Sequence, residues 1–505
     1  MNQYLLFFIA LIPIVWLMIS LGVLKMPGHK TTPITLLLTM ILAAVVWKMP
    51  MLSVTTAFLE GSAMALWPIV LVIIAAVFTY NLSLHTGSMD VIKKMMTSIT
   101  TDKRILILIL AWGFGGFLEA IAGFGTAVAI PAGIMAALGF EPVFAAIICL
   151  IANTTPTAFG AIGLPVTSLA KLVNLGVEKL SFDVAILLFL FIVVVPFVLV
   201  ILNEKSIKGI KGVFGITLAS GLAFALPQIF VAKYMGAELP AVLGSVCSMA
   251  VTIIIAKVFY KEKTSKNGEM ITLKQGFMAW LPFILVLVFI IGTSSLFPSI
   301  ANVLSKVSTS VKIYHGAGAK AYTFSWIATP GTLIIMAAFI GGLLQGQKLG
   351  IIAKILVKTA KQMSKSAVTI VAIVALAKVM GYSGMIKSIA VVLVAVTGGF
   401  YPFISPIIGA LGTFVTGSDT SANVLFGGLQ VEAAKSLGVN QYWLAAANTC
   451  GATAGKMISP QSIAVATAAT GLIGQEGKIF IKTLKFCLAY VAILGVMVYI
   501  GSLMM

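Results

Sequence analysis

Charged side chains are scarce in this sequence of 505 residues. Asp, Glu, Lys and Arg make up 9% of the chain, hydrophobic residues make up 60%, and the mean hydropathy is +1.12. A soluble domain of this length carries far more polar surface. Alternating patterns of the membrane-barrel type are missing as well, and long apolar runs dominate. The composition therefore predicts an all-α polytopic membrane protein.

Arginine, histidine and cysteine are also rare. Arg104 is the only arginine, so an anionic substrate must be held without a bidentate guanidinium clamp. The histidines and cysteines show neither metal-ligand spacing nor a CxxC pair: His29, His85, His315, Cys149, Cys247, Cys450 and Cys487. We therefore expect no metal site, no cofactor and no nucleophile–base set that would make an enzyme.

Lysine is plentiful, and the formal net charge is +19. In a soluble protein this balance would suggest nucleic acid as a partner. Here the basic residues gather in short stretches between apolar runs, which predicts inside loops and contact with anionic membrane lipid instead. Those loops place both termini outside, and they lie at 25–30, 93–104, 205–211, 257–274, 348–365 and 478–485. Lys171, Lys378 and Lys387 lie nearer the ends of apolar segments and are predicted to be interfacial.

About 12 apolar stretches approach the ~20 residues that a membrane-spanning helix needs. They lie at roughly 4–24, 32–48, 57–80, 142–170, 182–202, 212–231, 239–258, 276–293, 330–346, 366–380, 442–472 and 479–501. The first stretch has no basic n-region and no cleavage site, which favours a retained helix over a signal peptide.

Glu119 lies among glycines inside an apolar run, GGFLEAIAGFGTA. A carboxylate at membrane depth costs at least ~2.5 kcal/mol, so it is a candidate functional residue. The flanking stretches 105–118 and 126–139 are short for two spans, and the lysine topology requires an odd number of crossings here. A re-entrant hairpin over 104–140 satisfies both conditions, provided that its irregular backbone is buried or faces water.

A second stretch resembles the first, GTFVTGSDTSANVLFG, with Asp419 in the acidic position. Neighbouring stretches recur in the same order: HTGSMDVIKKMM with GYSGMIKSIAVV, and ALGFEPVFAAIICLIANTTP with SLGVNQYWLAAANTCGA. The lysine pattern gives the two copies opposite orientations, which predicts an inverted-topology repeat typical of secondary transporters. We predict a first repeat over 1–202, connecting helices over 203–275, and an inverted second repeat over 276–505.

Each repeat is expected to hold a short helix, a re-entrant hairpin and a broken span. The short helices are predicted at 88–100 and 385–398, the hairpins at 104–140 and 402–437, and the broken spans at 142–170 and 442–472. The breaks are expected at Asn153–Pro156 and at Asn448–Thr449, each followed by glycine and proline. Half-helix ends that meet near the membrane midplane present amides to an anion and carbonyls to a cation.

These hairpin tips and breaks carry the residues that we expect to bind substrate. They are Gly123, Gly125, Thr126, Asn153, Thr154, Thr155, Ser418, Thr420, Ser421, Asn423, Asn448 and Thr449. The alternative for each hydroxyl or amide is a hydrogen bond between helices or within its own helix.

Three charged residues complete the candidate site. Glu119 and Asp419 are candidates for carrying a coupling proton, and the alternative for each is to cap the returning helix of its hairpin. Lys456, in AGKMISPQS, has no counterpart in the first repeat. Its ammonium could hold a substrate carboxylate, pair with Glu119 or Asp419, or replace a bound Na⁺. The alternative is a lysine that snorkels to the interface.

The stretches GFLEAIAGFGTAVAIPAGI, ANTTPTAFGAIGLPVTSLA and TGSDTSANVLFGGLQ resemble the signature stretches of the bacterial L-lactate permease family. The resemblance runs the whole length. It implies a multi-pass protein of the bacterial cytoplasmic membrane that imports L-lactate, and also D-lactate or glycolate, by proton symport. It also implies membership of the ion transporter superfamily, with inverted repeats and re-entrant hairpins. The tips lack the Ser-Asn-Thr of dicarboxylate members, so their Na⁺ sites are not carried over. A Na⁺-coupled carboxylate carrier and an anion channel remain the alternatives.

Overall fold

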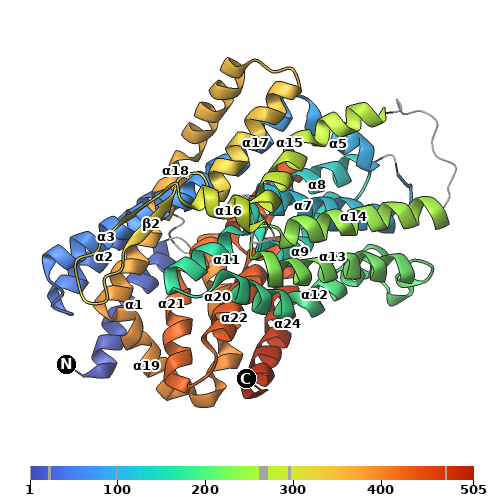
Figure 1. The fold of residues 1–505 in the computed structure, drawn as a ribbon. Helices are drawn as coiled ribbons and strands as arrows, with labels where there is room; N and C mark the ends of the chain where they lie inside the picture. Colours follow the sequence, from blue (N-terminus) through green and yellow to red (C-terminus); the bar gives the residue numbers. More distant parts are fainter. Residues whose placement is uncertain are drawn as a thin grey trace.

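The computed structural model describes residues 2–20, 24, 26–97, 99–123, 125–260, 271–293, 297–472 and 475–504. Lys25 and most of the predicted 257–274 loop lie outside these residues. Helices dominate the described chain (Figure 1). Ten of them are long and apolar enough to cross a membrane, and shorter apolar helices accompany them. The prediction of an all-α polytopic membrane protein is confirmed.

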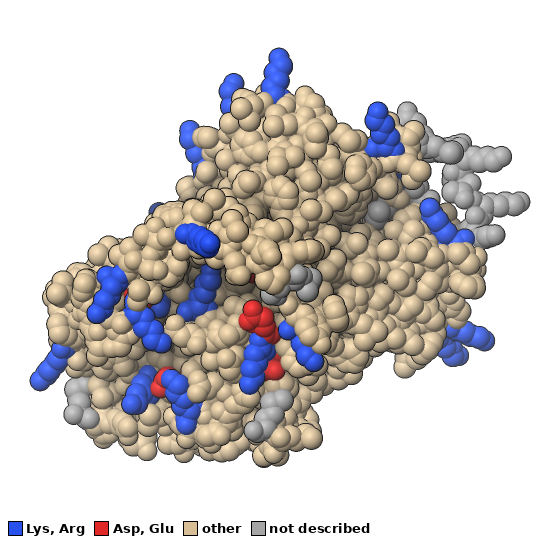
Figure 2. All heavy atoms as spheres, viewed as in Figure 1, with Lys and Arg blue, Asp and Glu red and all other residues tan. Residues whose placement is uncertain are grey.

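The outer surface suits lipid. Large apolar side chains on the peripheral helices are exposed, including Phe8, Val45, Phe230, Phe259 and Val396. Lysine and arginine side chains stand apart on an otherwise mostly uncharged face, and few carboxylates accompany them (Figure 2). An apolar surface of this extent would be costly in water and is favourable in a bilayer.

The N-terminal half runs from α1 to α12. Its elements are α1 (Gln3–Met18), α2 (Gly28–Val45), α3 (Met51–Met64), η2 (Ala65–Val70), α4 (Leu71–His85), α5 (Ser88–Thr97), α6 (Lys103–Ile107), η3 (Leu108–Phe114), α7 (Gly115–Ile121), α8 (Thr126–Ala137), α9 (Pro142–Ala152), α10 (Thr154–Thr157), α11 (Gly160–Val173) and α12 (Val177–Glu204). α3, η2 and α4 make one apolar stretch of 35 residues that kinks at Trp67, just before Pro68.

The connecting region and the C-terminal half follow. They comprise η4 (Ile207–Ile210), α13 (Phe214–Met235), α14 (Pro240–Phe259), α15 (Leu273–Gly292), α16 (Pro298–Ser305), β1 (Ser308–Val311), β2 (Tyr322–Ser325), α17 (Pro330–Leu344), α18 (Leu349–Ser383), α19 (Met385–Thr397), η5 (Gly398–Phe400), α20 (Tyr401–Thr416), α21 (Asp419–Leu437), α22 (Gln441–Lys456), α23 (Pro460–Thr470) and α24 (Glu476–Met504).

The order of elements recurs in the two halves. A 35-residue apolar stretch, a short helix, a hairpin, a broken helix and a long last helix follow one another twice. The hairpins are α6–η3–α7 with α8, and α20 with α21. The broken helices are α9–α10–α11 and α22–α23. Each hairpin contacts the broken helix of the other half, since α8 contacts α23 and α21 contacts α11. This cross-packing joins the two halves of the protein through their hairpins. The opposite orientation of the two halves stays a prediction.

The lysine-rich stretch 348–365 is not a loop, which corrects the sequence-based expectation. It forms the first half of α18, a continuous helix of 35 residues. Lys354, Lys358, Lys361 and Lys365 recur at spacings of three and four, so they share one exposed face of the helix. Lysine is a good helix former, and its charge therefore does not end the helix.

The segment 297–328, named here the outer segment, lies over the first half of the chain. It contains α16 and the antiparallel pair β1–β2, in which Ser308 faces Ser325. Trp67 Nε1 donates to the Ser325 carbonyl at 2.9 Å, and the Tyr322 hydroxyl donates to the Trp67 carbonyl at 2.7 Å. Ser53 Oγ donates to the His315 carbonyl at 2.8 Å. The outer segment is therefore attached to α3 and η2.

Arg104 and Asp102 anchor the start of the first hairpin. The Asp102 carboxylate accepts the Arg104 backbone N–H at 2.8 Å, which caps α6, and pairs with the guanidinium at 2.8 Å. Arg104 Nη1 also donates to the carbonyls of Gly209 and Lys211 at 3.0 and 3.1 Å. Burial acts to raise the pKa of Asp102, but the hydrogen bonds and charge of Arg104 outweigh it and lower the pKa below 3.8. Arg104 thus connects the hairpin to the turn before α13.

Replacing Asp102 with asparagine is expected to lower the free energy of unfolding by about 1 kcal/mol at neutral pH. Asparagine can still cap α6, but it loses the ion pair with the Arg104 guanidinium. Because the pKa of Asp102 is depressed, its stabilisation is complete above the unfolded value of 3.8 and is lost as pH falls through the folded pKa. Thermal unfolding in detergent at pH 7 and pH 3 measures this. Asp90→Asn, at an exposed pair with Lys93, is the control. An equal loss of stability in Asp102→Asn at both pH values would contradict a stabilising, ionised Asp102 with a lowered pKa.

Candidate functional site

The tip of the first hairpin is a tight turn between α7 and α8. Gly123 and Gly125 have φ of +58° and +88°, a left-handed conformation that glycine adopts without strain. Thr126, the first residue of α8, uses its hydroxyl to donate to the Gly123 carbonyl at 2.8 Å. Gly125 stands at the N-cap of α8 with no side-chain capping bond. Glu119 therefore does not cap this helix, and Phe124 lies outside the described residues.

The tip of the second hairpin turns at Gly417, whose φ is +72°. Ser418 caps α21, because its hydroxyl accepts the backbone N–H of Ser421 at 3.3 Å. An added Cβ at Gly417 would lie 2.0 Å from Gln461 Oε1, so the tip lies directly against the start of α23. The capping alternative for Asp419 is therefore wrong, because its neighbour Ser418 holds that position.

The first broken helix is interrupted twice, near where the sequence predicts it. α9 and the single turn α10 are separated at Asn153, and the start of α11 is unwound. Ala161, Ile162 and Gly163 have φ of 44°, 56° and 71°. An added Cβ at Gly160 would lie 2.8 Å from Glu119 Oε1. The unwound turn is therefore in contact with the carboxylate of the first hairpin.

The second break lies at Met457–Ser459, eight residues beyond the predicted Asn448–Thr449 position. α22 runs without interruption through Asn448 and Thr449 to Lys456. Pro460 cannot continue the helix and begins α23, whose first turn is capped by Ser459. The correction has a physical reason. The side chains of Asn448 and Thr449 bond to a neighbouring helix instead of to freed backbone groups.

Glu119, Asp419 and Lys456 face one another at the centre of the protein. Their relative exposures are 2%, 2% and 8%. Lys456 Nζ lies 3.9 Å from Glu119 Oε1. Glu119 Oε2 and both carboxylate oxygens of Asp419 have no hydrogen-bond partner among the described residues. Asp419 lies within electrostatic range of the other two. This group of three residues therefore holds two carboxylates against one ammonium.

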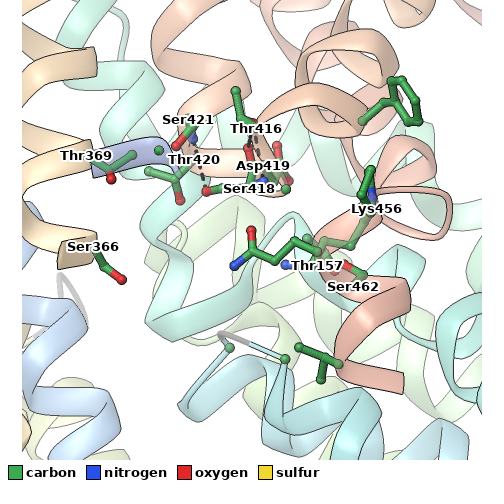
Figure 3. Close-up of a pocket in the computed structure, with 18 of the residues that line it drawn as sticks. Thr157, Ser366, Thr369, Thr416, Ser418, Asp419, Thr420, Ser421, Lys456 and Ser462 are labelled. Carbon is green, nitrogen blue, oxygen red and sulfur yellow. Dashed lines mark hydrogen bonds between the residues drawn. The ribbon is translucent and has the colours of Figure 1, made fainter. Parts of the chain in front are cut away.

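These groups line a cavity of about 830 Å³, within the usual ~300–1,000 Å³ of ligand pockets. Both hairpin tips and both breaks contribute to one side of it, and α2 and α18 form the opposite side. Figure 3 shows Ser366 and Thr369 of α18 across from Lys456, with the start of α21 between them. The predicted residues in the lining are Glu119, Gly123, Gly125, Ser418, Asp419, Thr420, Ser421 and Lys456.

Asn423, Asn448 and Thr449 do not line the cavity. Asn448 Nδ2 and Thr449 Oγ1 donate to Asn423 Oδ1 at 2.9 and 3.1 Å. Gln430 Nε2 donates to Asn448 Oδ1 at 3.1 Å, and Ser405 Oγ donates to Gln430 Oε1 at 2.8 Å. This buried network joins α20, α21 and α22. These three predicted residues thus adopt the helix-to-helix alternative.

The other predicted hydroxyls and amides also lie outside the lining. Thr126 bonds within its own hairpin tip, and the Thr154 hydroxyl donates to the Ile151 carbonyl at 2.7 Å. Asn153 and Thr155 are buried, and their side-chain polar atoms have no partner in the described part of the chain. They lie at the first break, next to the cavity-lining Thr157.

Several polar residues of the lining were not predicted from the sequence. They are His29, Thr157, Lys365, Ser366, Thr369, Thr416, Gln461, Ser462 and Glu476. A weak signal for two of them exists. Ser366 and Thr369 lie three residues apart, which places them on one face of α18. Lining by α18 could not be inferred, because nothing in the sequence indicates that this helix faces the hairpin tips.

A sequence model described as L-lactate permease matches residues 6–505. The chain belongs to the L-lactate permease family. Its relatives include the L-lactate permease of Streptococcus iniae, 58% identical over 87% of this chain and 93% of that one. The glycolate permease of Escherichia coli K12 is 35% identical over 97% and 94% of the two chains. The L-lactate permease of Bacillus subtilis 168 is 34% identical over 95% and 92%.

One solved structure supports the fold of this family member. The MtrF efflux pump of Neisseria gonorrhoeae is 14% identical, aligns with a TM-score of 0.52, and covers 95% of this chain and 97% of its own. The YdaH transporter of Alcanivorax borkumensis aligns over 85% and 84% of the chains with a TM-score of 0.45. At 14% sequence identity, the similarity to MtrF concerns the fold alone. The predicted family is confirmed, and with it a multi-pass membrane protein.

Proposed function

We propose that this chain is a secondary transporter that imports lactate, with glycolate as a second substrate, together with a proton. It acts in the bacterial cytoplasmic membrane. Family membership supports transport of a small monocarboxylate and not catalysis, because the relatives are named as lactate and glycolate permeases. The coupling to protons rests on the site itself.

The observation that carries the proposal is the unequal charge of the buried groups in the cavity, with Glu119 and Asp419 against Lys456. Lys365 and Glu476 also line the cavity, but both are more exposed and their opposite charges balance. With both buried carboxylates ionised, the three buried groups sum to one negative charge, which repels an anionic substrate. One bound proton makes the group neutral, and a lactate anion then restores the same single negative charge. The loaded and the empty site therefore carry equal charge, so proton and anion favour each other's binding.

The geometry suggests separate roles for the two acids. The Glu119 carboxylate lies 3.9 Å from the Lys456 ammonium and makes an ion pair with it. Asp419 has no partner for either oxygen, and a buried carboxylate without partners gains most from a proton. We therefore assign the coupling proton to Asp419. Glu119 has the separate role of orienting the Lys456 side chain.

The substrate carboxylate has three attractive groups within reach. Ser418, Thr420 and Ser421 bring the N-terminus of α21 to the cavity. Gln461 and Ser462 bring that of α23. The free amides and the dipole of a helix N-terminus favour an anion. With the Lys456 ammonium, they hold a carboxylate without an arginine.

Uptake into proteoliposomes tests the proposal. An inward proton gradient is expected to accumulate labelled L-lactate above its equilibrium level, and an inward Na⁺ gradient at equal pH is expected to have no effect. Unlabelled glycolate in excess should reduce the uptake. Accumulation that follows Na⁺ and ignores the proton gradient would contradict proton coupling. Flux that never exceeds equilibrium under either gradient would contradict active transport and favour a channel.

A further inference from the structure

A second buried ion pair lies away from the cavity, where α3 crosses α18. Lys378 Nζ lies 3.0 Å from Glu60 Oε1, and the side chains are 12% and 5% exposed. The Tyr382 hydroxyl donates to the same oxygen at 2.7 Å. Lys378 is therefore not an interfacial lysine, which corrects the sequence-based prediction. Lys171 and Lys387, by contrast, are exposed.

The two helices are in direct backbone contact beside this pair. An added Cβ at Gly61 would lie 2.4 Å from Ala375 Cα, so no side chain fits between α3 and α18 at that turn. Gly61 follows Glu60, and Ala375 precedes Lys378 by one turn of helix. The ion pair thus fastens a close crossing that glycine makes possible.

The outer segment covers the pair from the other side. The Tyr314 ring stacks on the Tyr382 ring, with centroids 3.7 Å apart and planes within 8°. The His315 backbone N–H donates to Thr56 Oγ1, one turn before Glu60 on α3, at 3.1 Å. Burial first, and then the charge of Glu60, raises the pKa of Tyr322 to about 12. These contacts shield the pair from water and strengthen its attraction.

The charge of this cluster differs from that of the cavity. Glu60 and Lys378 balance one to one, so the cluster has no surplus carboxylate to take up a coupling proton. The balanced pair instead suits a fixed contact between helices. Along the axis of α18, Lys378 lies about 7.5 Å from Ile373, because an α-helix rises 1.5 Å per residue. Ile373, Thr369 and Ser366 are the part of α18 that lines the cavity opposite Lys456.

We propose that Glu60, Lys378 and Tyr382 form a positioning site that fixes α18 against α3. This contact sets the place of the Ser366–Thr369 wall relative to Lys456, and through it the affinity for substrate. The three residues do not touch substrate and do not carry the coupling proton. The inference uses the proposed function only in taking lactate as the probe.

Lactate counterflow in proteoliposomes tests the proposal, because exchange needs no ion gradient and remains measurable even if the proposed coupling is wrong. Glu60→Gln and Lys378→Met each break the pair and should raise the half-saturation concentration about tenfold, since each leaves a buried charge alone. The double variant Glu60→Gln/Lys378→Met should recover to within about threefold of the original. Tyr382→Phe keeps the ring stack and should raise the value by about threefold.

Matched substitutions at exposed positions are the controls: Glu141→Gln, Lys387→Met and Tyr4→Phe. Rates are normalised to protein inserted in the vesicles, and the ratio of protons to lactate is measured for each functional variant. The ratio should stay unchanged. A double variant as impaired as the worse single one would overturn the positioning role. So would an unaltered half-saturation concentration in Glu60→Gln, Lys378→Met and Tyr382→Phe. A changed proton ratio would overturn it too, in favour of Glu60 as a proton carrier.

Discussion

Replacing Asp419 with asparagine is expected to abolish proton-driven lactate accumulation while lactate exchange continues. Asparagine has the shape of a protonated aspartate and cannot release the proton. Beside Glu119 and Lys456 it holds the site in the neutral state that accepts the anion. We expect accumulation to fall by at least about 100-fold, with counterflow within about threefold of the original. The pH dependence of lactate affinity should disappear as well.

Asp90→Asn is the matched control, because the Asp90 side chain is 73% exposed on α5. Both variants are compared at equal insertion, with the proton gradient and with counterflow. Full accumulation in Asp419→Asn would assign the proton elsewhere, and Glu119→Gln would then be the next variant to test. Loss of counterflow together with accumulation would also contradict the assignment, because it would make Asp419 necessary for binding itself.

Replacing Lys456 with methionine is expected to remove both exchange and accumulation. The substitution leaves Glu119 and Asp419 without a buried opposite charge beside them. The other lysine of the cavity lining, Lys365, is exposed and does not replace the buried ammonium. Removing one member of a buried pair costs roughly 3–5 kcal/mol. If this whole cost falls on substrate binding, it corresponds to a loss of about 10²–10⁴-fold in affinity. Lactate binding to the purified protein, followed by calorimetry, measures the effect directly.

Lys456→Arg and Lys387→Met are the companions of this experiment. Arginine keeps the charge with a larger head, and we expect it to retain partial binding. Lys387 is exposed on α19, so its loss should leave binding unchanged. Normal lactate affinity in Lys456→Met would show that the helix N-termini alone hold the carboxylate.

Much of the hairpin architecture could be read from the sequence. Glu119 and Asp419 stand out because carboxylates are costly in an apolar run, and Gly123, Gly125 and Gly417 indicate turns that need positive φ. Local signals of this kind act within a few residues. They therefore place both tips correctly along the chain.

Other positions depended on contacts between distant parts of the chain. Asn448 resembles a helix-breaking residue in sequence, yet it bonds to Asn423 and Gln430 and remains inside α22. Lys378 resembles an interfacial lysine, yet Glu60, 318 positions earlier, holds it in the interior. The residues that flank Asn448 and Lys378 in the sequence do not show whether such a partner exists. The position of each side chain is therefore decided only when the helices pack together.

The sequence by itself indicated the membrane class, the two glycine turns and the three charged residues, because hydropathy, glycine and buried charge act locally. The family followed from the resemblance of whole sequence stretches. Only the tertiary structure decided which of these residues face one cavity. It brought Glu119, Asp419 and Lys456 together from α7, α21 and α22, and it placed Ser366 and Thr369 of α18 opposite them. The physical reason is the cross-packing of each hairpin with the broken helix of the other half. That packing depends on side-chain contacts over some 300 residues, which no local pattern records.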